Sequence, residues 1–124
     1  MRALIKTASG AGNLAVMDAP VPVPGPGEAL VRILRSGLCG TDLLVHDGLY
    51  RGRKRPVPSP LILGHEASGE IVEVGPGTHG PSAGTRVAIE AVTGCGTCFQ
   101  CGRGRYNLCP VSYTHLTLPT ILRV

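Results

Sequence analysis

Four of the five cysteines in this chain lie close together, with gaps of two, two and seven residues: Cys95, Cys98, Cys101 and Cys109. Gaps this short let one stretch of backbone wrap a tetrahedral zinc ion, and glycines at 94, 96 and 102 allow the tight curvature. Four thiolates close the coordination shell and give a formal charge of 2 − 4 = −2, so such a zinc is a poor Lewis acid. Arg103 and Arg105 would offset part of this charge. The spacing predicts a structural zinc lobe over residues 94–110.

An iron–sulfur centre is the main alternative for these cysteines. It also uses four closely spaced thiolates, and in bacterial runs a proline follows the last one, as Pro110 follows Cys109. The bacterial run is tighter than this one, so the spacing favours zinc. Disulfides are less expected, because reducing conditions keep thiols free.

The remaining cysteine, Cys39, lies in GLCGTD, and His65 lies in LGHEASGEIVEVG. A thiolate and an imidazole are two of the three protein ligands that an open, catalytic zinc site needs. Taken alone, the two residues fit a buried cysteine and a hydrogen-bonded structural histidine better than they fit a metal site. In that case the chain would be a non-catalytic zinc-binding module with one metal ion.

Composition limits the class of protein. The 124 residues suit one domain, and 43% hydrophobic residues argue against disorder. The net charge of +4 is mild and only 3% of residues are aromatic, so we expect no nucleic-acid partner. No apolar run approaches the roughly 20 residues that span a bilayer, and no secretory signal is recognisable. We therefore expect a cytoplasmic protein without a membrane partner.

The elements that must position these residues are short strands, because 18 glycines and 11 prolines exclude a helical bundle. Gly10, Gly12 and Ala15 fit a relaxed dinucleotide fingerprint, but PVPVPGPG follows where a helix would be needed, so they indicate a hairpin turn. A short helix over 41–46 is expected, capped by Thr41 or Asp42. The apolar pattern predicts a partly open β-barrel with strands at 3–5, 14–17, 28–34, 61–63, 67–74 and 85–92.

The last stretch, residues 111–124, differs in texture from the chain before it. It reads VSYTHLTLPTILRV, rich in Ser, Thr and Leu. It could form one more strand, but it also looks like a translated adapter sequence. We expect it to be non-native and assign it no function.

Four motifs together resemble a known family: GLCGTD (37–42), GHEASGEIVEVG (64–75), TRVAIEA (85–91) and CGTCFQCGRGRYNLCP (95–110). They resemble the amino-terminal, GroES-like domain of the zinc-dependent medium-chain dehydrogenases, which include alcohol, polyol and threonine dehydrogenases. The likeness covers residues 1–110, and IEA and GRYNLCP look most like the sorbitol and iditol branch. The resemblance implies a mainly β fold, a GroES-like partly open β-barrel with short helices and a zinc-binding lobe.

The resemblance also implies roles for particular residues. Cys39 and His65 would be ligands of a catalytic zinc, with Glu66 close to the metal. Thr41 would relay the proton of the substrate alcohol, and Asp42 would orient the histidine. The four-cysteine lobe would hold the second zinc of each subunit. On a regular strand the side chains of His65 and Glu66 would point oppositely, so both could reach one metal only at a bend.

The family reaction passes a hydride from a secondary alcohol or polyol to NAD(P)+, usually in a homo-oligomer. The third catalytic-zinc ligand and the nucleotide-binding domain lie beyond residue 124 in the family, so we expect a fragment that does not turn over. Leu44 stands where the family often has a histidine, and Thr85 replaces the aspartate of GDRVA. A zinc-free quinone reductase relative is disfavoured, because that group lacks the cysteine lobe.

Overall fold

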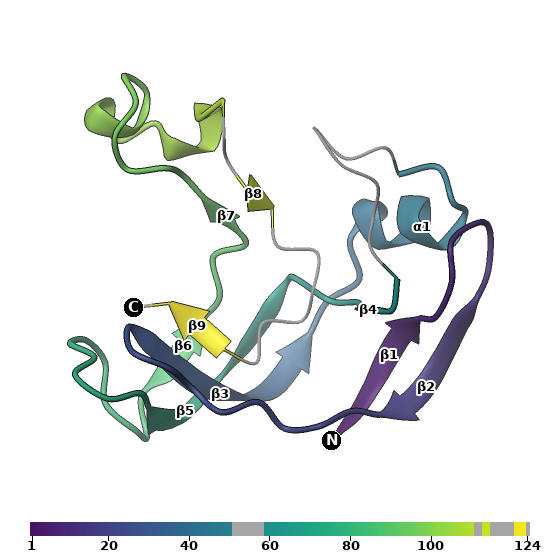
Figure 1. The fold of residues 1–124 in the computed structure, drawn as a ribbon, viewed down its shortest axis with the longest axis horizontal. Coiled ribbons are helices and arrows are strands. Elements are labelled where there is room, and N and C mark those ends of the chain that lie inside the picture. The colour runs from purple at the N-terminus through teal and green to yellow at the C-terminus, as the bar shows by residue number, and fades with distance from the viewer. Residues whose placement is uncertain (51–58, 111–112, 115–120, 124) are drawn as a thin grey trace.

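The computed structural model describes residues 1–50, 59–110, 113–114 and 121–123 (Figure 1). Most of the regular structure is strand, in three sheets with the orders β2-β1-β4, β6-β5-β3-β9 and β7-β8. The strands and helices are β1 (Arg2–Lys6), β2 (Leu14–Asp18), β3 (Glu28–Ser36), α1 (Gly40–His46), β4 (Leu61–Ile62), β5 (Ala67–Val74), β6 (Arg86–Ala88), β7 (Val92–Thr93), the 3-10 helices η1 (Cys101–Arg103) and η2 (Tyr106–Leu108), β8 (Tyr113–Thr114) and β9 (Ile121–Arg123).

The predicted hairpin at the amino end is confirmed. β1 and β2 pair antiparallel from Arg2 opposite Asp18 to Lys6 opposite Leu14, and the glycine-rich segment forms the turn between them. The other edge of β1 takes β4, with Lys6 opposite Leu61. Because β4 runs on through Leu63 to Gly64, this small sheet reaches the motif that contains His65.

The larger sheet is built on the antiparallel pair β3 and β5, which were predicted at 28–34 and 67–74. Its core is aliphatic, formed by Ala29, Val31 and Ile71. The register shifts between Ile33 and Arg35, opposite Gly69. A Cβ at Gly69 would lie 2.4 Å from the carbonyl oxygen of Arg32, so only glycine lets the strands approach here.

The prediction of one strand over 85–92 is wrong in its continuity. β6 pairs with β5, but the chain leaves that sheet after Ile89, whose amide still donates to the Ala67 carbonyl at 2.9 Å. The next strand, β7, pairs with β8 instead. Tertiary pairing thus divides an apolar run that has no breaker residue, and the second half leads into the cysteine lobe.

The predicted helix forms as α1, but the predicted cap is wrong. Cys39 is the N-cap residue, and Asp42 is the third residue of the helix. Its carboxylate accepts the Cys39 backbone N–H at 2.9 Å, which is the backward half of a capping box. Val45, on the buried face of α1, packs with Leu61 and Leu63 in a second apolar cluster.

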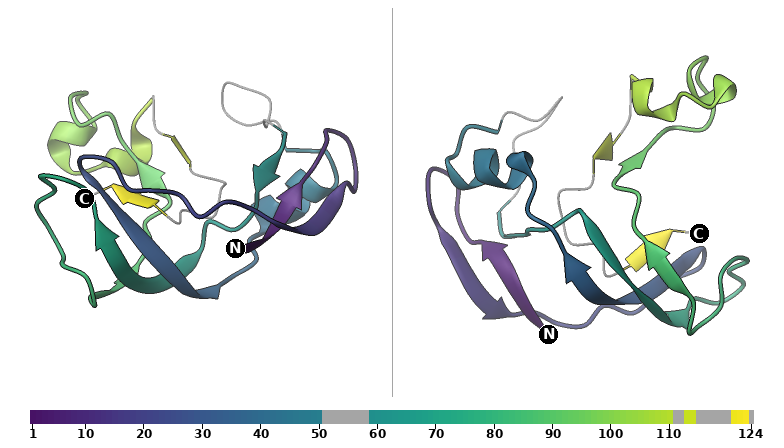
Figure 2. Two further views of the ribbon diagram at one scale, coloured as in Figure 1. Left: turned by 60° about the horizontal axis from the view of Figure 1, so that its bottom comes forward. Right: turned by 180° about the vertical axis from the view of Figure 1, so that it is seen from behind.

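The sheets do not close, so the barrel is partly open, as predicted. The cysteine lobe and α1 lie toward opposite ends of the molecule (Figures 1 and 2). In the part of the chain that is described, no helix is long and apolar enough to cross a membrane. β8 and β9 fall in the stretch expected to be non-native; they pair with β7 and with β3, and the origin of this stretch stays a prediction.

Candidate metal centres and the adjoining cavity

The structure brings Cys39, His65 and Glu66 together. One ligand atom from each lies within 4.8 Å of the others. Cys39 comes from the start of α1, whereas His65 and Glu66 occupy the irregular link between β4 and β5. Gly64, just before them, has φ +109°, a conformation that L side chains rarely adopt. This bend lets neighbouring side chains turn to the same side, which a regular strand would forbid.

Gly37, which follows β3, also holds the link between β4 and β5 that contains His65 and Glu66. Its amide donates to the Glu66 carbonyl oxygen at 2.7 Å. A Cβ at Gly37 would lie 3.2 Å from Glu66 Oε2, tighter than an ordinary contact. The first glycine of the GLCGTD motif therefore leaves space for the Glu66 side chain.

Asp42 and His65 form the buried part of this site, with 4% and 5% of their surfaces exposed. His65 Nδ1 lies 3.6 Å from Asp42 Oδ1, and among the described residues neither atom has a hydrogen-bond partner. A small closure would let Nδ1–H donate to the carboxylate. The proton would then sit on Nδ1, leaving Nε2 free to bind a metal ion, which is how outer carboxylates orient metal-bound histidines.

Thr41 lies beside the thiol of Cys39. Its Oγ1 is 3.5 Å from Cys39 Sγ, and the residue is half-buried. A hydroxyl at this place can give and accept a proton next to any group bound at the cluster.

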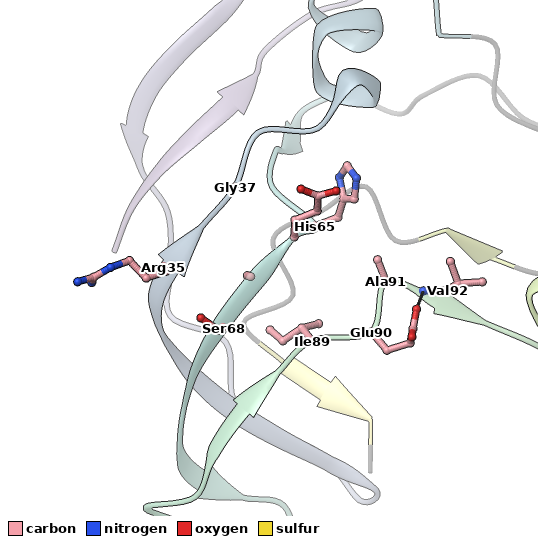
Figure 3. A pocket seen from close by; sticks show the side chains of 10 residues that line it. Arg35, Gly37, His65, Ser68, Ile89, Glu90, Ala91 and Val92 are labelled. Atoms are coloured by element: carbon pink, nitrogen blue, oxygen red, sulfur yellow. Dashed lines mark hydrogen bonds between the residues drawn. The ribbon is translucent and has the colours of Figure 1, made fainter.

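A cavity of about 580 Å³ opens beside His65 and Glu66. Its other walls are Ile89, Glu90, Ala91 and Val92 (Figure 3). Arg35 also lines it, but its guanidinium points away from the histidine. The volume lies within the range of small-molecule sites, and the cavity offers carboxylates and an imidazole as polar groups.

Glu90 connects this cavity to the cysteine lobe. Its Oε1 accepts the Val92 amide N–H at 3.2 Å, and its Oε2 accepts the Tyr106 hydroxyl at 3.4 Å. The sequence motif IEA contains this residue, but its role could not be inferred from type or spacing. Only the fold of β7 and η2 brings its partners near.

The four-cysteine lobe is a separate group of metal ligands, whose ligand atoms also lie within 4.8 Å of one another. The Sγ atoms of Cys98 and Cys109 are 3.8 Å apart. Four sulfurs bound to one zinc at about 2.3 Å are about 3.8 Å apart. An iron–sulfur cluster is larger than a single ion and would hold its cysteines further apart. The distance between the sulfur atoms of Cys98 and Cys109 therefore fits zinc better.

Backbone amides point at the sulfurs of this lobe. Cys98 N–H donates to Cys95 Sγ at 3.3 Å, and Cys95 N–H to Cys109 Sγ at 3.4 Å. The Thr97 hydroxyl, and then the amides of Thr97 and Cys98, lower the pKa of the Cys95 thiol from 9.0 to about 6. Loss of water contact raises the pKa of Cys101 to about 11. Such amide bonds favour thiolates, the form that binds metal.

Glycine is required at one point of the lobe. A Cβ at Gly94 would lie 2.6 Å from Cys101 Sγ and 2.9 Å from Tyr106 Cβ. Arg103, expected to offset the charge of the thiolates, has its guanidinium carbon 4.1 Å from the centre of the Phe99 ring. It therefore makes a cation–π contact on the surface of the lobe.

Comparison with known proteins finds relatives that are dehydrogenases. The profile of the alcohol dehydrogenase GroES-like domain matches residues 25–120. L-threonine 3-dehydrogenase of Pyrococcus horikoshii is 42% identical over 109 residues, which are 88% of this chain and 31% of that protein. Sorbitol dehydrogenase of Halalkalibacterium halodurans is 44% identical over 110 residues, with the same coverage of 88% and 31%. These similar values do not separate the sorbitol branch from the threonine branch.

Solved structures agree in fold. An NAD-dependent alcohol dehydrogenase superposes with a TM-score of 0.85 at 35% identity, covering 99% of this chain and 37% of that one. A thermostable alcohol dehydrogenase from Pyrobaculum aerophilum gives 0.81 at 34% identity, covering 94% and 35%. The chain spans about 31% of the length of the curated relatives named above. It belongs to the alcohol dehydrogenase GroES-like domain family, and the expected GroES-like, mainly β fold is confirmed.

Proposed function

We propose that this chain forms the metal-binding part of a zinc-dependent dehydrogenase that oxidises a secondary alcohol or polyol with NAD(P)+. One observation carries the proposal: Cys39, His65 and Glu66 converge beside a cavity, and the buried Asp42 backs the histidine. The donor set fits zinc, because thiolate, imidazole and carboxylate are its usual protein ligands and three leave a position open.

When bound, zinc would lower the pKa of an alcohol in this cavity and so favour the alkoxide from which a hydride can leave. Cys39 and His65 would hold the metal ion, with Glu66 able to approach it. A thiolate, a neutral imidazole and one carboxylate would balance the two positive charges. Asp42 would keep the proton of His65 on Nδ1. Thr41 would relay the proton of the alcohol, accepting it at Oγ1 while its own hydroxyl proton passes on to water in the open cavity.

The four-cysteine lobe would hold the second zinc in a structural role. Its four thiolates leave no open position for a substrate. Each of the two sites therefore has a different task, and the parent subunit would carry two zinc ions.

Substrate and cofactor choice depend on the whole protein. Two relatives are named for L-threonine and for sorbitol, and both of these compounds have a secondary hydroxyl beside other polar groups. Their names support a small hydroxylated metabolite as substrate. The nucleotide site, the third ligand of the catalytic zinc and the contacts of a homo-oligomer would come from the remaining length of such a protein. This chain alone should bind metal in the cytoplasm without turning over.

A second candidate is a structural zinc module without catalysis. The lobe supports it, because one segment supplies all four of its ligands. The second cluster, formed by Cys39, His65 and Glu66, has three. In that case Cys39 and His65 would be packing residues.

Elemental analysis of zinc in the purified chain separates the candidates, with Cys39→Ser and Cys98→Ser each serving as control for the other. We expect nearly two zinc ions in the wild type and the loss of one in each variant. One zinc ion that is lost only in Cys98→Ser would contradict the catalytic proposal and favour the structural module.

A further inference from the structure

Lys6 is a buried cation for which the metal sites so far give no role. It is 3% exposed. Its Nζ donates to the carbonyl oxygens of Gly10, of Gly12 at 2.5 Å and of His46 at 3.1 Å. An ammonium group has three donors, so all of them are used. A buried charge is tolerated only where it is hydrogen-bonded, and these three carbonyls therefore determine where the side chain can sit.

The three acceptors belong to two separate segments. Gly10 and Gly12 lie in the turn of the β1–β2 hairpin, and His46 is the last residue of α1. The Gly12 amide also donates to the His46 carbonyl, at 2.8 Å. A Cβ at Gly48, just after the helix, would lie 2.8 Å from the carbonyl carbon of Gly10. The end of α1 is thus fastened directly to the tip of the hairpin.

The backbone of Lys6 is joined to the other half of the metal site. β1 pairs with β4, with Lys6 opposite Leu61, and the Leu63 amide donates to the Leu4 carbonyl at 2.9 Å. The chain then passes through Gly64 to His65. The backbone of Lys6 therefore holds β4, the strand that leads to His65. The side chain of Lys6 holds α1, the helix capped by Cys39.

α1 depends on such contacts for its position. A helix of seven residues is too short to be stable by itself. The packing of Val45 against Leu61 and Leu63 is apolar, and apolar contact has no preferred direction. Hydrogen bonds do have one, and a cation beside the last carbonyl of a helix is favourable.

The geometry points to Lys6 as a positioning residue that sets the separation between Cys39 and His65 by fixing α1 against β4. It touches neither ligand and acts through the helix. The inference rests on the proposed function, because it assigns Lys6 a part in the same metal site.

The test compares the wild type with Lys6→Met, Lys6→Gln and Lys6→Arg in the presence of a chelator, by nuclear Overhauser spectroscopy. The wild type should give cross-peaks between the His65 ring and the side chains of Cys39 or Asp42. Lys6→Met should lose them while the cross-strand peaks of β3 and β5 remain, and Lys6→Arg should keep them. Lys6→Gln keeps an uncharged donor and should weaken them, which provides a readout even where Lys6→Met does not fold.

Titration with cobalt gives a second readout. After the first ion has filled the four-cysteine lobe, the dissociation constant of the second should rise in Lys6→Met by about tenfold, the lower end of the range for groups that contact a ligand directly, because Lys6 acts through the helix. Leu14→Ala is the control, because Leu14 packs on the same apolar cluster and takes part in none of the hydrogen bonds of α1 that the structure describes. Its second cobalt ion should bind as in the wild type.

Two results would overturn the inference. One is the retention of the His65 cross-peaks in Lys6→Met, and the other is their absence from the wild type. A wild type that shows the peaks but binds no second cobalt ion would count against the proposed function and leave the role of Lys6 intact.

Discussion

The two metal-ligand clusters of this chain are assembled in opposite ways. The lobe takes Cys95, Cys98, Cys101 and Cys109 from one short segment, and amides of that segment donate to its sulfurs. The other cluster takes Cys39 from a helix and His65 from a strand end more than twenty positions away, and it is backed by side chains of other elements. The lobe is local, whereas the second cluster depends on the fold.

This difference fits the two proposed tasks. A local loop can surround an ion completely and leave no open position. A site assembled between elements can keep one side open, and here that side is the cavity lined by His65 and Glu66. The consequence is that a change inside the lobe should leave the second cluster unaffected, and a change beneath α1 should leave the lobe unaffected.

The largest effect is expected from Gly94→Ala. The new methyl group would lie 2.6 Å from Cys101 Sγ and 2.9 Å from Tyr106 Cβ, so the loop must shift. Overpacking of this kind costs about 2–3 kcal/mol, which corresponds to about a 30- to 150-fold loss of zinc affinity in the lobe. Competition with a chromophoric chelator measures that affinity.

Gly102→Ala is the matched control for this variant. A Cβ there meets nothing within 4 Å, so the affinity of the lobe should not change. Equal affinities in the two variants would contradict the account of Gly94.

The same difference explains how much could be predicted from sequence. The lobe follows from the spacing of four cysteines, and the hairpin and the β3–β5 pair follow from apolar patterns and turn residues. Such features depend on neighbours along the chain. The break after Ile89 could not be predicted, because β7 leaves the sheet for a partner that lies elsewhere in the chain.

The second cluster was only partly predictable. Resemblance to a family identifies Cys39 and His65, and it places Glu66 near them. The sequence indicates only that a bend is needed for His65 and Glu66 to reach one metal ion. The contact of Gly37 with Glu66 and the burial of Asp42 required the fold. Lys6 was missed altogether, because a single lysine in a strand gives no sign that its ammonium group is buried.

A smaller effect, confined to the second cluster, is expected from Asp42→Asn. The amide oxygen can still accept the Cys39 N–H, so α1 should keep its start. The negative charge that would hold a proton on His65 Nδ1 is lost, however. The affinity for the second cobalt ion should fall about tenfold, the lower end of the range for outer-shell partners.

Asp47→Asn is the control, since Asp47 is exposed and contacts only the neighbouring His46 among its described ion pairs. Cobalt absorption from the four-cysteine lobe should be the same in both variants. A loss of lobe absorption in Asp42→Asn would mean that the two clusters are not independent.

The smallest effect is expected on the pKa of Cys95 in the metal-free lobe. The Thr97 hydroxyl is the largest cause of the lowered pKa of Cys95, which is about 6 against 9.0 for a free thiol. A lowered pKa stabilises the folded thiolate; this contribution is complete above pH 9.0 and is lost as the pH falls through about 6. In the chelated chain Cys95 should therefore react with iodoacetamide at pH 7 before Cys101, whose pKa is raised to about 11.

Thr97→Val should move the midpoint of Cys95 alkylation to higher pH, because the largest cause of the lowered pKa is lost. The rate at pH 7 should change less, because a thiolate of higher pKa is also more nucleophilic. Peptide mapping by mass spectrometry measures the rate at each cysteine. Thr7→Val is the control and should leave the rate unchanged, because among the described residues the exposed Thr7 hydroxyl donates to the Asn13 carbonyl in the hairpin, away from the lobe. Cys39 should react at the same rate in the wild type, Thr97→Val and Thr7→Val, because its sulfur belongs to the second cluster and not to the lobe that contains Thr97. A changed rate at Cys39 in Thr97→Val would show that the lobe and the second cluster are coupled.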